Sequence, residues 1–235
     1  MRQIVLDTET TGLAADQGHR IIEIGCLELV NRRLTGRTLH LYLNPERPID
    51  EAATEVHGMT WDDLRDKPRF AEVADQVLAF VDDAQVLIHN AAFDVAFLDA
   101  ELARVGRGRF RASCREVVDT LLMARELHPG KRNSLDALCD RYGVSNAHRT
   151  LHGALLDSEL LAEVYLAMTR GQESFEIALD TAQTRREAGP QIDWPPRGLR
   201  VLGVTDDERA AHEVALAAIG KERRGTPIWG DAEPG

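Results

Sequence analysis

Hydrophobic and polar side chains alternate along the first part of the chain. Apolar residues recur at every second position in residues 20–30 and 37–43, and a run of three apolar residues opens a third stretch, residues 4–9. A period of two places successive side chains on opposite faces of a strand, so each stretch predicts a strand with one covered face. Residues 31–33 and 35–36 between them have the composition of turns. We therefore expect an antiparallel meander of three strands.

After residue 50 the apolar positions recur every three to four residues, which is the period of a helix. This period predicts helices at 51–56, 70–81, 117–126 and 135–142, one that follows Asn90, and one whose stripe runs from Leu156 to Met168. A short apolar run at 84–89 predicts a further strand, and Asn90 is placed to cap the helix after it. Three strands followed by helices and a short strand predict an α/β domain with helices covering a mixed sheet.

The composition changes after about residue 180. Two stretches, 184–190 and 194–196, are rich in Arg, Gly and Pro and predict a flexible or extended tether. Thr205 and Glu208 then have the spacing of a capping box, and the helix that they begin is expected to stop at Gly220. One helix cannot form a core of its own, so we expect this tail to dock on a partner.

Composition and charge narrow the classes of function. The 235 residues are 43% hydrophobic, which is enough for a core, and carry a net charge of −11 at pH 7. This sign argues against a nucleic-acid binder that relies on its own overall charge. Three cysteines without CxxC spacing predict reduced thiols in a cytoplasmic protein. No apolar run suggests a signal peptide or a membrane span.

Three carboxylates in the first part of the chain are candidates for metal binding. Asp7 and Glu9 share one face of the strand predicted at 4–9, where they repel each other unless a cation neutralises them. Mg²⁺ and Mn²⁺ prefer such oxygen ligands. Asp94 lies in the first turn of a predicted helix. A strand that ends in a solvated acidic turn is the common interpretation of such a pair taken alone, and the helix dipole favours an acid at Asp94 in any case.

Asp157 lies on the same helical stripe as Leu161, a poor place for an unpaired charge. It therefore needs a cation, or it pairs with Arg149 or Arg141. His152 precedes it by five residues, an offset of roughly 140° on a regular helix. We therefore expect His152 on the loop before the helix begins, where a histidine can also be an ordinary surface residue.

Taken together, these residues resemble a known signature. Asp7, Glu9, Asp94 and Asp157, with His152 before the last, are similar to the four acids and histidine of the DEDDh 3′→5′ exonucleases. Longer stretches, among them 129–139 and 149–157, resemble one branch of that family, the proofreading (epsilon) subunits of bacterial DNA polymerase III. The likeness is dense over residues 2–170. It implies a ribonuclease H-like fold, with a mixed five-stranded sheet flanked by helices, a flexible C-terminal tether and a short helical tail.

The resemblance also implies a mechanism. Two divalent cations, Mg²⁺ or Mn²⁺, would be bridged by Asp7, with Glu9 and Asp157 completing one site and Asp94 supporting the other. His152 would be the general base, which requires a neutral imidazole. The resemblance gives a set of residues expected to bind the terminal nucleotide, which are Asp7, Glu9, Thr10, Ala52, His57 and Asp157.

Three further features have two interpretations each. Phe93 either wedges beside the terminal base or packs in the core with Phe97. Asp119 is interpreted as a helix cap rather than a metal ligand. Residues 131–133, with sequence Lys-Arg-Asn, either contact phosphate or form a solvated basic turn.

The resemblance divides the chain into functional segments. Residues 1–170 would be the exonuclease domain, 171–180 a sliding-clamp-binding segment, 181–199 a flexible linker and 200–235 a tail that binds the polymerase catalytic (alpha) subunit. The expected clamp contacts are Gln172, Ser174, Phe175 and Ile177. Tethering to a polymerase would bring a frayed or single-stranded DNA 3′ end to so acidic a chain. A small accessory subunit of the theta kind is a further partner that the sequence leaves open.

Two other classes of function remain at this stage. The first is an RNA-trimming DEDDh exoribonuclease of the oligoribonuclease or RNase T kind, against which the long tail argues. The second is a structural subunit that bridges polymerase and clamp, against which the five intact catalytic positions argue.

Overall fold

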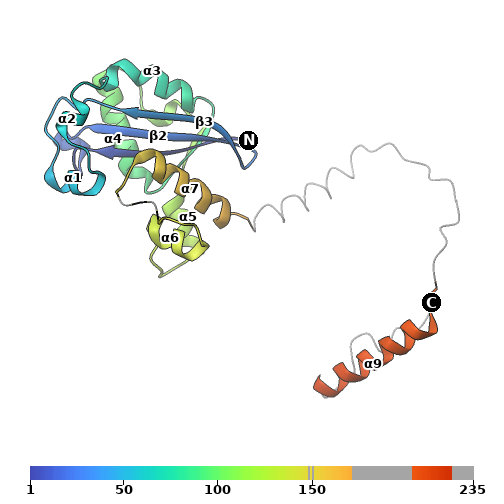
Figure 1. The fold of residues 1–235 in the computed structure, drawn as a ribbon. Coiled ribbons are helices and arrows are strands. Elements are labelled where there is room, and N and C mark those ends of the chain that lie inside the picture. Colours follow the sequence, from blue (N-terminus) through green and yellow to red (C-terminus); the bar gives the residue numbers. More distant parts are fainter. Residues whose placement is uncertain (148, 150, 171–202, 224–235) are drawn as a thin grey trace, which may run out of the picture. The chain divides into compact units, whose positions relative to one another are not determined.

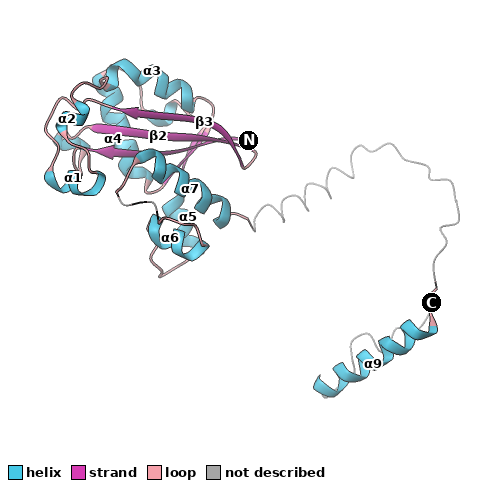
Figure 2. Cartoon of the chain, in the orientation of Figure 1, coloured by secondary structure: helices cyan, strands magenta, loops and turns pink. Residues whose placement is uncertain are grey.

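The computed structural model of this chain describes residues 1–147, 149, 151–170 and 203–223. By its contacts the chain divides into two compact units, Met1–Ala182 and Gln183–Gly235. The first contains a sheet with helices around it, and the second contains one described helix (Figures 1 and 2). The expected clamp-binding segment and linker lie outside the described residues.

The first unit is built on one five-stranded sheet. Its strands are β1 (Arg2–Thr10), β2 (Ile21–Val30), β3 (Arg33–Tyr42), β4 (Gln85–Ile88) and β5 (Glu116–Asp119). They lie in the order β3-β2-β1-β4-β5. The first three strands pair antiparallel, and β4 pairs parallel with both β1 and β5. The predictions of a meander and of a mixed five-stranded sheet are therefore confirmed.

Helices cover both faces of this sheet. The helices of this unit are α1 (Glu51–His57), α2 (Trp61–Leu64), α3 (Phe70–Val81), α4 (Ala91–Arg104), α5 (Thr120–Leu127), α6 (Leu135–Tyr142) and α7 (Ala154–Met168), with short 3-10 turns at η1 (Ala15–Gln17) and η2 (Phe110–Ala112). Ile4 and Leu6 of β1 pack with apolar residues of α3 and α4. Val5, between them, packs with α6 and α7 on the opposite face. The alternation along β1 thus separates two cores.

Two expectations about strands and turns were wrong. Residues 117–119, expected to begin a helix, belong to β5, where Val117 and Val118 pair with β4 and the helix starts only at Thr120. β-branched residues suit a pleated strand, which explains the outcome. The expected turn at 35–36 lies inside β3, at an irregularity in the pairing with β2 where Gly36 has φ +83°. Glycine adopts this conformation without strain.

Two expectations about helix ends were also wrong. Asn90 stands at the start of α4 with φ +68°, but its side chain makes no capping hydrogen bond. Instead Asp119 accepts from the backbone N of Asn90 and of Ala91, at 3.3 and 3.1 Å. In the second unit, α9 (Asp206–Arg223) continues past Gly220, because one glycine lowers helix stability without ending the helix.

The start of α9 is as predicted. Thr205 N donates to Glu208 Oε2 at 2.9 Å, and Glu208 N donates to Thr205 Oγ1 at 3.3 Å, which is a capping box. Val214 on this helix is 71% exposed, so the helix buries little apolar surface within the described residues. None of the helices in the described ranges is long and apolar enough to cross a membrane.

Candidate active site

Asp7 and Glu9 lie at the carboxyl end of β1, on the face that α7 covers. Val5, two residues before Asp7, packs in the core shared with α7. Because side chains in a strand alternate, Asp7 and Glu9 point to the same face as Val5. The sequence prediction that the two carboxylates share one face is therefore confirmed.

The close approach of α7 to the sheet brings Asp157 to this pair. Opposite Asp7, β2 carries Gly25, and a Cβ atom there would lie 2.2 Å from the backbone carbonyl carbon of Ala154. Only glycine leaves room for the first turn of α7. Ser158 Oγ then donates to the Gly25 carbonyl at 3.0 Å. Asp157, next to Ser158 and 4% exposed, is thus held at the edge where Asp7 lies.

Helix α4 brings the fourth acid. Asp94 stands in its first turn and is 3% exposed, and it accepts a hydrogen bond of 2.7 Å from Thr8 Oγ1. Asp119 fixes the starts of α4 and α5 together, because it also accepts from Leu121 N at 2.9 Å. The interpretation of Asp119 as a helix-capping acid is therefore confirmed.

The gathered acids shift one another's pKa. Burial raises the pKa of Asp7 well above its usual range, and the charges of Asp94, Asp157 and Glu9 raise it further. Burial, together with Asp157, raises the pKa of Glu9 to about 7. Burial likewise raises the pKa of Asp94 to about 7, although the hydrogen bond from Thr8 opposes the shift. Burial and neighbouring negative charge thus disfavour the ionised form of these three acids. A bound cation would stabilise them as carboxylates, so the site suits a divalent metal ion.

Arg149 joins Asp157 to His152. Its Nε and Nη2 donate to the two oxygens of Asp157 at 2.5 and 2.6 Å, and its Nη1 donates to Asp136 Oδ1 at 2.7 Å. Burial favours a higher pKa for Asp157, but the hydrogen bonds from His152 and Arg149 outweigh it and leave the pKa below its usual range. Of the two arginines proposed as partners of Asp157, the structure selects Arg149.

His152 stands on the segment before α7, as expected, with its side chain 45% exposed. Its Nδ1 lies 3.2 Å from Asp157 Oδ2 and 2.8 Å from Arg149 Nη2, and its backbone N donates to the Val56 carbonyl at 3.0 Å. The hydrogen bond with Asp157 raises the pKa of His152. One ligand atom each of Glu9, His152 and Asp157 lie within 4.8 Å of one another.

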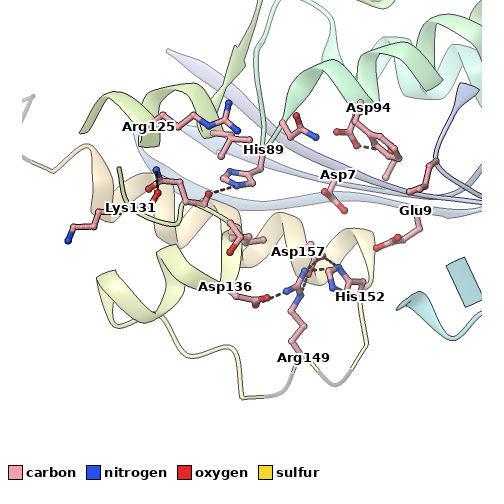
Figure 3. Close-up of a pocket in the computed structure, with 18 residues that line it drawn as sticks. Asp7, Glu9, His89, Asp94, Arg125, Lys131, Asp136, Arg149, His152 and Asp157 are labelled. Atoms are coloured by element: carbon pink, nitrogen blue, oxygen red, sulfur yellow. Dashed lines mark hydrogen bonds and ion pairs between the residues drawn. The ribbon is translucent and has the colours of Figure 1, made fainter. Parts of the chain in front are cut away.

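These side chains line one cavity of about 730 Å³ (Figure 3). All four acids and His152 are among its lining residues. Phe93 also lines it, while its ring lies 4.9 Å from that of Phe97, so both interpretations of Phe93 are compatible with its position. Lys131 and Asn133 line the cavity as well. The structure thus brings together every residue predicted to bind metal or to act as the base.

Three predicted substrate-binding residues do not line this cavity. Thr10 is buried and donates to the Gly12 carbonyl at 2.7 Å. Ala52 lies in α1, and His57 ends that helix at 5% exposure. Burial lowers the pKa of His57, whose Nδ1 accepts from Met59 N at 3.1 Å. Their role in binding a terminal nucleotide remains a prediction.

Three residues that shape the site were not predicted from the sequence. Thr8 hydrogen-bonds Asp94, and Asp136 holds Arg149, but neither stands out in a single sequence because the contacts join distant segments. Gly25 did carry a signal: a glycine in the middle of an apolar strand often marks a close approach of another backbone.

Comparison with known proteins agrees with this geometry. A family model described as exonuclease matches residues 4–165. DNA polymerase III subunit epsilon of Escherichia coli (strain K12) is 51% identical over 97% of this chain and 97% of its own length. The protein of the same name from Pasteurella multocida (strain Pm70) is 48% identical over 97% of this chain and 93% of its own length.

Solved structures share the fold. Exonuclease X in complex with 5′-overhanging duplex DNA is 25% identical, with a TM-score of 0.55 over 72% of this chain and 92% of that one. A zinc-bound complex of Escherichia coli exonuclease I with single-stranded DNA is 18% identical, with a TM-score of 0.66 over 77% of this chain and 43% of that one, and shows the fold alone. The chain therefore belongs to the exonuclease family and, within it, to the epsilon subunits of DNA polymerase III.

Proposed function

We propose that this exonuclease removes mispaired nucleotides from the 3′ end of DNA, using two divalent cations, as the proofreading subunit of a replicative DNA polymerase III. The observation that carries this proposal is the convergence of Asp7, Glu9, Asp94 and Asp157 with His152 in one cavity. The names of the two relatives described above support the polymerase assignment. The proposal ranks above RNA trimming and above a purely bridging role.

The donor set suits the proposed ions. Four carboxylates offer hard oxygen ligands, and the raised pKa of Asp7, Glu9 and Asp94 reflects charge that the protein leaves uncompensated. Asp7, Glu9 and Asp157 would hold one Mg²⁺ or Mn²⁺, and Asp7 with Asp94 the other. When bound, such ions stabilise the attacking and leaving oxygens of a phosphodiester displacement.

His152 is the proposed general base, and its two neighbours at Nδ1, Arg149 and Asp157, favour opposite tautomers of its ring. Arg149 can only donate hydrogen bonds. When His152 Nδ1 accepts one from Arg149, the proton of the neutral ring is on Nε2, and Nε2 cannot then take a proton from water. If Nδ1 instead donates to Asp157, Nε2 is free to take a proton from the attacking water. Catalysis therefore requires Nδ1 to keep the contact with Asp157 rather than the one with Arg149. Asp136, already bonded to Arg149, can hold the guanidinium meanwhile.

The proposed partners follow from the same assignment. The tail at 200–235 would bind the polymerase alpha subunit, with α9 presenting exposed apolar residues such as Val214. Segment 171–180 would bind the sliding clamp, and a theta-like subunit would be an additional partner. Deleting residues 171–235 should abolish binding to polymerase and clamp while the nuclease activity remains. A truncated domain that folds but cuts nothing would refute this division.

The first test is degradation of a DNA primer with a 3′ mismatch by the full-length chain, with Mg²⁺ or Mn²⁺. A matched primer and a single-stranded RNA are tested alongside it as comparison substrates. We expect single nucleotides to be released from the DNA 3′ end, with the activity lost on chelation and in Asp7→Ala/Glu9→Ala. A control variant, Asp62→Ala/Asp66→Ala, removes two carboxylates outside the cavity lining and should retain activity.

Each other outcome of this test points elsewhere. Rapid trimming of RNA with little cleavage of DNA would replace the proposal by an RNA-processing exonuclease. A folded wild-type protein that cuts neither substrate would leave the bridging role. Activity that survives in the Asp7→Ala/Glu9→Ala variant would place the active site elsewhere.

A further inference from the structure

The cavity has two ends of opposite charge. In Figure 3, Glu9 and His152 lie at one end, while Arg125 and Lys131 lie at the other, with His89 between them. All five side chains line the same cavity. A ligand that occupies its whole length would meet the proposed metal ligands at one end and two cations at the other.

Within the described residues, the two cations at the basic end have no acidic partner. Arg125 and Lys131 are exposed, and neither forms an ion pair there. Arg149, the third cation of the cavity, differs from them because it is already bound to Asp136 and Asp157. The positive charge at the basic end is therefore available to an anionic ligand.

The turn that presents Lys131 is held in place by several hydrogen bonds. Asn133 Nδ2 donates to the carbonyls of His128 and Lys131, at 3.3 and 3.1 Å. Arg141 donates to Asn133 Oδ1 at 3.0 Å and to the Arg132 carbonyl at 2.7 Å. These hydrogen bonds keep the Lys131 backbone in one position beside the cavity.

His89 connects this turn to the catalytic end. It follows β4 and is five residues before Asp94. Its Nε2 donates to the Asn133 carbonyl at 3.0 Å, and its Nδ1 lies 3.1 Å from Thr120 Oγ1 in α5, the helix that carries Arg125. Burial lowers the pKa of His89, and the charge of Arg125 acts in the same direction. His89 thus ties the basic end to the sheet, in surroundings that disfavour a charge on its ring.

We propose that Arg125 and Lys131 form a second binding subsite, which holds the phosphodiester backbone of the strand upstream of its 3′-terminal nucleotide. The inference rests on the proposed function, since the terminal phosphodiester must lie at the acids for the strand to extend towards the cations. Lys and Arg bind such phosphates by charge and hydrogen bonding without reading the bases. The subsite gives a net-acidic chain a local hold on nucleic acid. It also sets the direction of the strand through the cavity.

The test compares substrates that do and do not reach the basic end. A single-stranded oligonucleotide of about ten residues carries upstream phosphates, whereas the p-nitrophenyl ester of thymidine 5′-monophosphate carries none. For full-length Arg125→Gln/Lys131→Gln we expect the ratio of kcat/KM for oligonucleotide to kcat/KM for ester to fall about tenfold or more. The slope of log(kcat/KM) against log[salt] for the oligonucleotide should become less negative by about 1.4, at about 0.7 for each lost phosphate contact.

The control variant is Arg104→Gln/Arg109→Gln, which removes the same charge at two exposed residues outside the cavity lining. It should leave both the ratio and the slope as in the wild type. An equal effect in both double variants would assign the result to net charge and overturn the subsite. An unaltered ratio in Arg125→Gln/Lys131→Gln would overturn it as well. A wild type that cleaves neither substrate would instead contradict the proposed function.

Discussion

Gly25→Ala is the substitution that most directly tests how the fold positions the site. The new Cβ atom would lie 2.2 Å from both the carbonyl carbon of Ala154 and the amide nitrogen of Leu155, and 2.3 Å from the Ala154 oxygen. These are backbone atoms at the start of α7, so no side-chain rotation relieves the overlap. Carbon atoms in contact are about 3.5–4.0 Å apart, so α7 and β2 must separate by about 1 Å or more.

This separation has two consequences of different size. Overpacking of this kind destabilises a domain by about 1–3 kcal/mol, and each kcal/mol lowers the melting temperature of a chain of this length by about 2–4 °C. Asp157 moves with the first turn of α7 and away from Asp7. A misplacement of about 1 Å at a catalytic group can lower the rate by about 10²-fold. The loss of activity should therefore greatly exceed the loss of folded protein.

The assay measures Mn²⁺-dependent cleavage of a 3′-mismatched primer and thermal unfolding on the same protein. Gly108→Ala is the matched control, because a Cβ atom at Gly108 meets nothing within 4 Å and the residue has no positive φ. We expect the control to resemble the wild type in both measurements. A Gly25→Ala protein with activity within about threefold of wild type and an unchanged melting temperature would refute the role assigned to this contact.

Three further predictions concern the charged residues. Asp119→Ala removes the hydrogen-bond acceptor at the starts of both α4 and α5. At about 0.5–2 kcal/mol for each cap, the free energy of unfolding measured in urea should fall by about 1–4 kcal/mol. An unchanged urea midpoint would contradict this role. The raised pKa of Glu9 and of Asp94, about 7 in the folded state, means that metal-free stability falls as pH rises from about 4 to 7. Mn²⁺ should therefore raise the melting temperature more at pH 8 than at pH 5.5, and equal gains would count against this. In Arg149→Gln the acidic limb of the pH–rate profile should move to higher pH, because the Arg149 charge lowers the pKa of His152; a limb that stays or moves down would exclude this effect.

The sequence predicted those parts of the fold that local pattern determines. The apolar run that opens β1, the alternation along β2 and the recurring apolar positions of α7 are local patterns, which a single chain displays directly. β5 was not predicted, because its four residues are too few to show a period and α5 follows without a break. The residue that caps α4 was not predicted either, because this acceptor, Asp119, lies 28 residues from Ala91 in sequence.

The candidate site follows the same division. Asp7 and Glu9 could be paired from strand geometry, and Asp157 from its place on an apolar stripe. The residues that compensate or position these acids, such as Thr8 and Asp136, are joined to them only by tertiary contacts. Such contacts leave no local periodicity, so a single sequence does not predict them.

The four acids differ in how far the protein itself compensates them. Asp157 receives two hydrogen bonds from Arg149, and Asp94 receives one from Thr8. Within the described residues, the carboxylates of Asp7 and Glu9 have no hydrogen bond or ion pair of their own, although the charges of Arg149 and His152 lower the pKa of Glu9. A partly buried carboxylate without a partner is costly, and the raised pKa of both groups expresses that cost. Asp7 and Glu9, on β1, are therefore the two acids that depend most on a cation for a direct partner, and the contributions of α4 and α7 complete a site whose centre is the strand.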